Sequence, residues 1–147
     1  MIVTDIFSQL TRDEGVRLQK YRDSRGFDTI GIGHNLDANP LPFDISNGIT
    51  LAQAEQILRD DVARIGAKLF SALPWLGNLD VARQGVFLNM AFNMGVGGVE
   101  AFHHDLADTK AGDYMKAAAD MQQSAWYVQV GARAARLCQQ MRTGVWQ

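Results

Sequence analysis

Two carboxyl side chains near the start of the chain, Glu14 and Asp23, have the types and spacing of a catalytic acid pair. They stand nine positions apart, Glu14 at the end of a charged, helix-like run and Asp23 in the turn-rich segment DSRG. A chain reversal between them would bring both side chains to one cleft from different stretches of backbone. Such a pair can cut a glycosidic bond, because one carboxyl protonates the leaving oxygen while the other activates water or stabilises a positively charged sugar. Acids at this spacing are also common on solvated surfaces, so the pair alone leaves both interpretations open.

The segment TIGIGH adds a hydroxyl at Thr29 and an imidazole at His34. A threonine hydroxyl both donates and accepts hydrogen bonds, so it can orient a water molecule. Threonine is also a common β-branched strand residue with no chemical role. His34 could act as a base or form an ion pair beside the cleft. The residue types do not decide between these roles.

The elements around these residues are a helix followed by a β-hairpin. Thr4 can cap a helix over residues 4–14, and Gly15 is a usual helix stop. Strands are predicted at Leu18–Tyr21 and Thr29–Ile32, on either side of the turn that holds Asp23.

A long helix is predicted after an irregular segment. Two prolines make regular structure improbable over residues 35–48, whereas Thr50 and Gln53 form a capping-box pattern that opens a helix. Apolar residues follow at helical spacing until Pro74 ends the element.

The remainder of the chain favours further helices. The first, Val81–Met94, is apolar nearly all round in its second half, which is typical of a helix buried at the centre of a bundle. Gly95, Gly97 and Gly98 are expected to break it. Shorter helices are expected at residues 99–108, 113–123 and 130–140.

These elements predict a single α+β domain of two lobes with a cleft between them. We expect a β-rich lobe at about residues 15–49, a connecting helix at about 50–70, and a helical lobe at about 70–147 that packs with the helix at 4–14. A cleft between two lobes is a natural place for a ligand.

Composition excludes several classes of protein. The chain has 147 residues, a net charge of −2 and one cysteine, Cys138, so it has no intrachain disulfide and no cysteine cluster for zinc. The charge gives no general attraction to nucleic acid, and the sequence shows neither a secretory signal nor a membrane span.

The ordered motifs resemble the phage-type lysozymes of the T-even bacteriophages, glycoside hydrolase family twenty-four. The resemblance rests on EGVRL, DSRG and TIGIGH, and resumes in NGIT, LDVARQGVFLNMAFNMG, SAWY and RTGVW. It covers nearly the whole chain and implies a lysozyme-like fold. The segment between His34 and Thr50 is shorter than in those proteins, so one lip of the cleft is expected to be reduced.

The resemblance implies roles for individual residues. Glu14 corresponds to the general acid, Asp23 to the carboxylate that works with a bound water, and Thr29 to the hydroxyl that holds this water. Phe92 and Asn93 correspond to the far wall of the sugar cleft; helix packing is the alternative reading for both.

Other correspondences are structural. Arg133 and Arg136 match arginines that approach Glu14 and the preceding acid, Asp13. A neighbouring cation favours an ionised carboxyl, whereas a general acid has to hold a proton. The arginine and the proposed role of Glu14 therefore make opposite demands on its protonation.

The resemblance also pairs His34 with an acid on the long helix, here Asp61. Asp105 and Asp120 stand at positions that lie near the saccharide in the family. Trp126, Tyr127 and Trp146 are expected to be core residues that join the last helix to the first.

The implied function is that of an endolysin, a muramidase that hydrolyses the β-1,4 bond after N-acetylmuramic acid with inversion. The expected partner is the peptidoglycan glycan strand, with no metal, no cofactor and a monomeric state. Synthesis is expected in the host cytoplasm, with action on the wall once the membrane is opened. The alternatives are an inactive glycan-binding module, a phage structural domain, and a hydrolase of chitin-type polymers.

Overall fold

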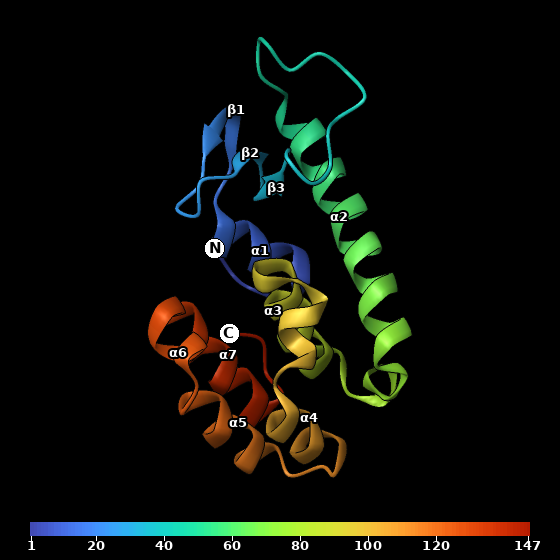
Figure 1. The fold of residues 1–147 in the computed structure, drawn as a ribbon, viewed down its shortest axis with the longest axis vertical. Helices are drawn as coiled ribbons and strands as arrows, with labels where there is room; N and C mark the ends of the chain where they lie inside the picture. The colour runs from blue at the N-terminus through green and yellow to red at the C-terminus, as the bar shows by residue number, and fades with distance from the viewer.

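A computed structural model describes all residues from Met1 to Gln147, and Figure 1 shows an elongated molecule with the sheet near one end and most helices at the other. The strands are β1 (Arg17–Arg22), β2 (Asp28–Gly31) and β3 (His34–Asn35). The helices are α1 (Ile6–Glu14), α2 (Leu51–Ala72), the 3₁₀ helix η1 (Pro74–Asn78), α3 (Val81–Glu100), α4 (His103–Lys110), α5 (Tyr114–Gln122), α6 (Ala125–Val130) and α7 (Ala132–Thr143). The predicted α+β class is confirmed. None of the helices combines the length and apolar character that crossing a membrane requires.

Helix α1 begins one residue later than a Thr4 cap would place it. The cap is Asp5, whose Oδ1 accepts a hydrogen bond from the Ser8 backbone N–H at 2.8 Å, while Ser8 Oγ accepts from the Asp5 N–H at 3.2 Å. The helix ends at Gly15 as predicted, with φ at 74°. Glu14 is therefore the last residue of the helix.

The sheet is antiparallel in the order β1-β2-β3, and Tyr21 pairs with Thr29 across β1 and β2. The predicted hairpin is confirmed, but β3 was not predicted. That strand has only two residues, of which His34 pairs with Ile30. A strand this short has no periodicity from which it could be recognised.

Helix α2 runs along one side of the molecule and connects its two ends (Figure 1). The predicted capping box is present, because Thr50 Oγ1 accepts from the Gln53 N–H and Gln53 Oε1 accepts from the Thr50 N–H. The helix stops two residues before Pro74, which opens η1. The division into lobes at residues 15–49, 50–70 and 70–147 stays a prediction.

Helix α3 changes direction at Gly95, where φ is 81° and ψ is 163°. The predicted break is therefore right at Gly95, but Gly97 and Gly98 lie in a further helical stretch that reaches Glu100. The helix predicted from residue 99 consequently begins only at His103. Helix α6 was not predicted, since its six residues are too few for an amphipathic pattern.

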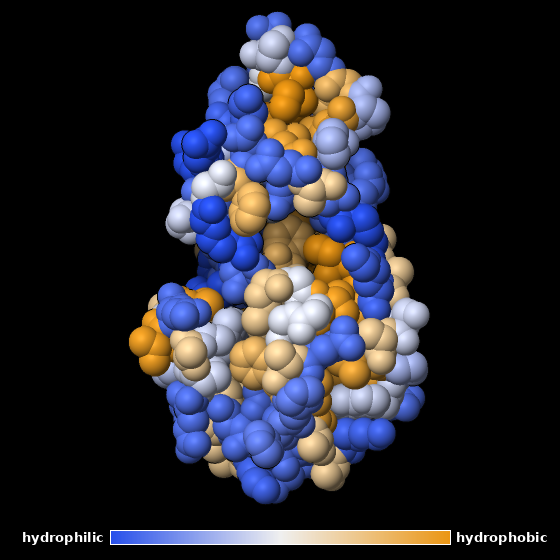
Figure 2. Space-filling model, viewed as in Figure 1, coloured by the Kyte–Doolittle hydropathy of each residue, from blue (hydrophilic) through white to orange (hydrophobic).

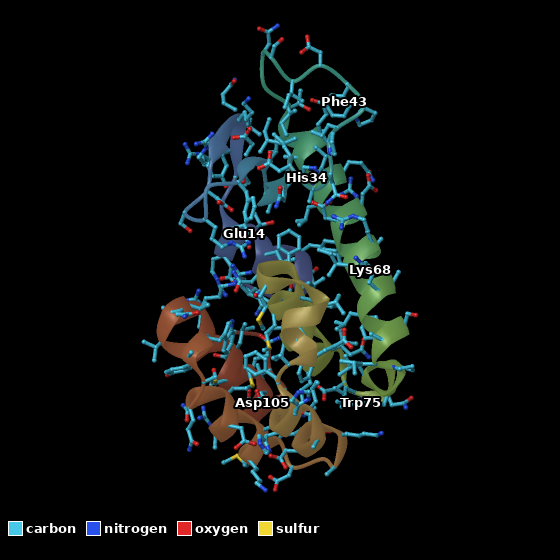
Figure 3. The ribbon with its side chains drawn as sticks, in the orientation of Figure 1. Glu14, His34, Phe43, Lys68, Trp75 and Asp105 are labelled. Carbon is cyan, nitrogen blue, oxygen red and sulfur yellow. The ribbon has the colours of Figure 1, made fainter.

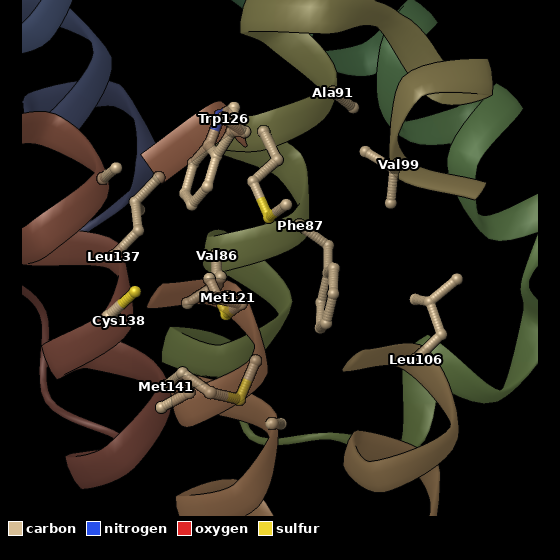
Figure 4. Packing of buried hydrophobic residues seen from close by; sticks show 14 of the residues in the cluster. Val86, Phe87, Ala91, Val99, Leu106, Met121, Trp126, Leu137, Cys138 and Met141 are labelled. Atoms are coloured by element: carbon tan, nitrogen blue, oxygen red, sulfur yellow. The ribbon is translucent and has the colours of Figure 1, made fainter. Parts of the chain in front are cut away.

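Two apolar cores hold the fold together. The larger lies mainly among α3 to α7, where Phe87 and Met121 are fully buried (Figure 4). Trp126 of this core packs edge-on against Phe102, with ring centroids 5.8 Å apart. The smaller joins α1, the sheet and α2 through buried leucines, isoleucines and one alanine. Trp146 packs against this smaller core, which contains residues of α1. Trp126 and Tyr127 pack in the larger core with residues of α7, so the predicted core position holds for both, but the predicted link to α1 does not.

Candidate active site

A cleft of about 480 Å³ lies between the sheet, α2 and α3. Figure 2 shows a hollow between the two halves of the molecule with hydrophilic side chains on both sides. The predicted site residues that line this cleft are Glu14, Asp23, Thr29, Asp61, Phe92, Asn93 and Arg133. His34 does not line it and lies behind the wall, 4% exposed.

Glu14 faces the cleft from the end of α1 (Figure 3). Arg133 of α7 donates from Nη1 to Glu14 Oε1 at 2.9 Å, which confirms the predicted contact. The other side of the carboxyl packs on Gly33, where an added Cβ would lie 2.7 Å from Oε2. Because φ of Gly33 is also +67°, only glycine fits this position without displacing Glu14.

Asp23 lies in the turn between β1 and β2, and the turn fixes its carboxylate. Its Oδ1 accepts from the backbone N–H groups of Arg25 and Phe27, both at 2.9 Å. Its Oδ2 makes no hydrogen bond within the chain. One carboxylate oxygen is therefore used to build the turn, and the other is available to a ligand in the cleft.

Thr29 is on β2, and only 3% of its surface is exposed. Its Oγ1 donates to the carbonyl oxygen of Phe27 at 2.9 Å. With its proton engaged in this way, the hydroxyl can only accept from a further partner. Thr29 and the free oxygen of Asp23 thus offer two acceptors in the same cleft.

A buried polar network supports Glu14 from behind. Asp13 Oδ2 accepts from Asn89 Nδ2 at 3.0 Å, and Asp13 Oδ1 accepts from Arg136 Nη2 at 3.1 Å, as predicted. Asn89 Oδ1 in turn accepts from Arg133 Nε at 2.8 Å. Burial raises the pKa of Asp13, but hydrogen bonds from Asn89 and Arg12 and the charge of Arg133 outweigh it and lower the pKa overall.

Asn89 is a site residue that the sequence did not reveal. It is fully buried within the apolar stretch GVFLNMAFNM, and it orients the guanidinium that holds Glu14. A lone amide inside an otherwise apolar helix was the only available signal, because buried polar groups need partners.

Comparison with known proteins identifies the family. The family model described as phage lysozyme matches residues 11–142. The chain belongs to the phage lysozyme family. Membership confirms the predicted lysozyme-like fold and supports a glycosidase that acts on peptidoglycan.

Individual relatives differ in how much of their length the chain matches. The chain is 34% identical to the pre-baseplate central spike protein Gp5 of Enterobacteria phage T4 over 92% of its own length, but it spans 27% of that protein. It is 29% identical to probable T4-type lysozyme 1 of Dictyostelium discoideum, covering 97% of this chain and 96% of the relative. A shorter match, 39% identical over 57 residues, is to the endolysin of Salmonella phage P22.

The contact between His34 and Asp61 predicted from the family is present behind the cleft. His34 Nδ1 lies 2.7 Å from Asp61 Oδ2, and His34 Nε2 donates to the Asn39 carbonyl at 2.7 Å. Because Nε2 must carry a proton to donate, Nδ1 can also donate to Asp61 only when the ring is charged. Burial lowers the pKa of His34, but the bond to Asp61, its negative charge and the Asn39 bond raise the pKa overall.

We expect the His34→Asn variant to lose more unfolding free energy at acid than at alkaline pH. The pKa of folded His34 lies above its ordinary value of 6.5, so its contribution is fully present below 6.5 and is lost as pH rises through the folded pKa. Urea unfolding of both proteins at about pH 5 and about pH 9 measures the difference. An equal loss at both values would contradict a charged pair.

The predicted sugar-contacting residues lie on α3 just before the Gly95 kink. Phe92 and Asn93 line the cleft and are partly exposed, and the Asn93 side chain makes no hydrogen bond within the chain. Both are therefore available to a ligand, although Phe92 also packs against the smaller core.

Asp105 and Asp120 lie away from this cleft. They line a second hollow, of about 270 Å³, on the helical side of the molecule, and Figure 3 shows Asp105 far from Glu14. The expectation that they lie beside a saccharide held by Glu14 and Asp23 is therefore not met. Neither hollow contains three or more His, Cys, Asp or Glu side chains arranged to hold a metal ion.

Proposed function

We propose that this member of the phage lysozyme family is an N-acetylmuramidase that hydrolyses the β-1,4 bond between N-acetylmuramic acid and N-acetylglucosamine with inversion. The observation that carries the proposal is the meeting of Glu14, Asp23 and Thr29 in one cleft from three separate segments. An endolysin role, with synthesis in the host cytoplasm and action on the wall after the membrane opens, forms part of this proposal.

Glu14 acts as the general acid. Its carboxyl donates a proton to the glycosidic oxygen, and the bond from that oxygen to the anomeric carbon breaks. Arg133, 2.9 Å from Glu14 Oε1, then stabilises the carboxylate that remains. The backbone of Gly33 limits movement of the side chain on its other face.

Asp23 and Thr29 act on a water molecule. The Thr29 hydroxyl accepts one water O–H, because its own proton is held by the Phe27 carbonyl at 2.9 Å. The free oxygen of Asp23 accepts the second water O–H and removes that proton as the water attacks. When the water donates one O–H group to Thr29 and the other to Asp23, one of its lone pairs points toward the anomeric carbon.

Attack from the face opposite the leaving oxygen inverts the configuration at that carbon. Inverting glycosidases separate their carboxyl groups by roughly 6.5–9.5 Å, which leaves room for the water. The origin of Glu14 and Asp23 on different elements, with the cleft between them, supports such a separation.

Mass spectrometry of digested peptidoglycan tests the proposal. We expect N-acetylmuramic acid at the new reducing ends, and proton NMR of the first products should show the α-anomer. N-acetylglucosamine at the reducing ends would contradict the bond assignment, and an initial β-anomer would contradict inversion. Chitin oligomers serve as the comparison substrate.

A second candidate, a phage structural domain without catalysis, is favoured by the 34% identity to the T4 spike protein. The relative named a probable T4-type lysozyme matches over nearly its whole length and supports the enzyme. A turbidity assay on bacterial cell walls separates the two, since a structural or binding domain clears no walls.

A further inference from the structure

The wall of the cleft formed by α2 carries two cations that the proposed hydrolysis does not use. Asp61, Arg64, Ile65 and Lys68 all line the cleft. Their spacing of three, four and seven residues places them on one face of the helix. Figure 3 shows Lys68 on α2, across the gap from Glu14.

The single acid on this wall is already fully occupied. Asp61 is 5% exposed, its Oδ2 lies 2.7 Å from His34 Nδ1, and its Oδ1 accepts from Arg64 Nη2 at 2.9 Å. Each oxygen of Asp61 therefore already has a partner, and neither forms an ion pair with Lys68.

The two cations keep free donors. The Arg64 side chain is 42% exposed, and only its Nη2 atom is used. Lys68 is exposed and lies within 4.0 Å of no carboxylate, and its ammonium makes no hydrogen bond. The wall therefore has an excess of positive charge in a chain whose net charge is −2.

Such a wall has no advantage for a neutral glycan. Acetamido sugars carry no charge, whereas a muramyl residue carries a lactyl group that ends either in a carboxylate or in a peptide with carboxylates of its own. The arginine fork and the lysine ammonium are both suited to a carboxylate.

We propose that Arg64 and Lys68 form a carboxylate subsite that binds the acidic substituent of a muramyl residue in the cleft. The inference rests on the proposed function and adds the basis on which the enzyme selects peptidoglycan over chitin. The cations bind this substituent and take no part in bond cleavage.

The decisive variant is Arg64→Gln with Lys68→Gln. Exposed charge pairs are worth little individually, so we expect KM for peptidoglycan fragments to rise by about three- to tenfold while kcat changes less than twofold. The charge-retaining variant Arg64→Lys with Lys68→Arg should restore much of the lost KM. The control, Arg59→Gln with Lys110→Gln, removes the same charge outside the cleft and should leave KM unchanged.

Binding measurements identify the source of the carboxylate. Calorimetric titrations in an Asp23→Asn background compare three probes: muramyl oligomers with a free lactyl group, the same oligomers with stem peptides, and chitin oligomers. A loss confined to the first or second probe assigns the carboxylate to the lactyl group or to the peptide. Affinity for chitin oligomers should not change.

The proposal is overturned if the double variant binds all three probes as before, or loses affinity for chitin oligomers equally. An equal loss in the control would also overturn it, because long-range charge would then explain the effect. Since the titrations need no turnover, a failure of wild-type protein to cleave walls would contradict the proposed function separately.

Discussion

The Asp23→Asn variant should lose activity by about 10²- to 10⁴-fold, the usual contribution of a general base. Its side-chain oxygen can still accept from the Arg25 and Phe27 N–H groups, so the turn should survive. The amide cannot take a proton from water, and it presents a donor where the cleft needs an acceptor. Turnover on purified peptidoglycan measures the loss, and near-ultraviolet circular dichroism checks the fold.

Asp28 provides a matched control in the same hairpin. Its carboxylate lies 3.8 Å from Arg22, is 36% exposed and does not line the cleft. Asp28→Asn should therefore change turnover less than twofold. If Asp23→Asn kept more than a tenth of wild-type activity with an intact fold, Asp23 would have no role as base.

The Asp105→Asn variant should make the protein more stable at slightly alkaline pH. Asp105 is 3% exposed, and its Oδ2 has no hydrogen-bond partner. Burial, followed by the charges of Asp120 and Asp108, raises the pKa of Asp105 to about 7. The neutral asparagine removes the cost of ionising this buried group.

The sign follows from linkage. The pKa of folded Asp105 lies above its ordinary value of 3.8, so folding favours the protonated form, and stability falls as pH rises from about 4 to about 7. One unit of pKa corresponds to about 1.4 kcal/mol, which gives a gain on the order of 2–4 kcal/mol at pH 8 and little at pH 4.

Denaturant unfolding at the two pH values measures this gain. Asp60→Asn is the control, because that carboxylate is exposed on α2 and accepts a hydrogen bond only from Gln56. A gain at pH 4 as large as at pH 8 would show that the charge of Asp105 is not the cause.

Local signals in the sequence predicted much of the fold. The Thr50 and Gln53 side chains cap α2 by contacts within one turn, and Gly15 and Gly95 mark real ends or kinks because glycine accepts positive φ. The short elements β3 and α6 were not predicted from the sequence, since they form only through packing against the rest of the molecule.

The site was predictable only in part. The family resemblance predicted that Thr29 belongs with Glu14 and Asp23, whereas Thr29 alone reads as an ordinary strand residue. Asn89 meets Asp13 across 76 positions of sequence, and Gly33 meets Glu14 through folding of the hairpin. Contacts of this kind depend on tertiary packing, which has no local pattern.

The position of helix α1 has a consequence for how the protein unfolds. Its Ile6 and Leu10 belong to the core shared with the sheet, while Gln9 bonds to Gln140 and Asn89 on the helical side. Helix α1 thus packs against both the sheet and the helical bundle. If it detaches, each of them loses part of its packing. Heat should therefore melt the sheet and the helical bundle in one cooperative transition, with no stage at which one half stands folded alone.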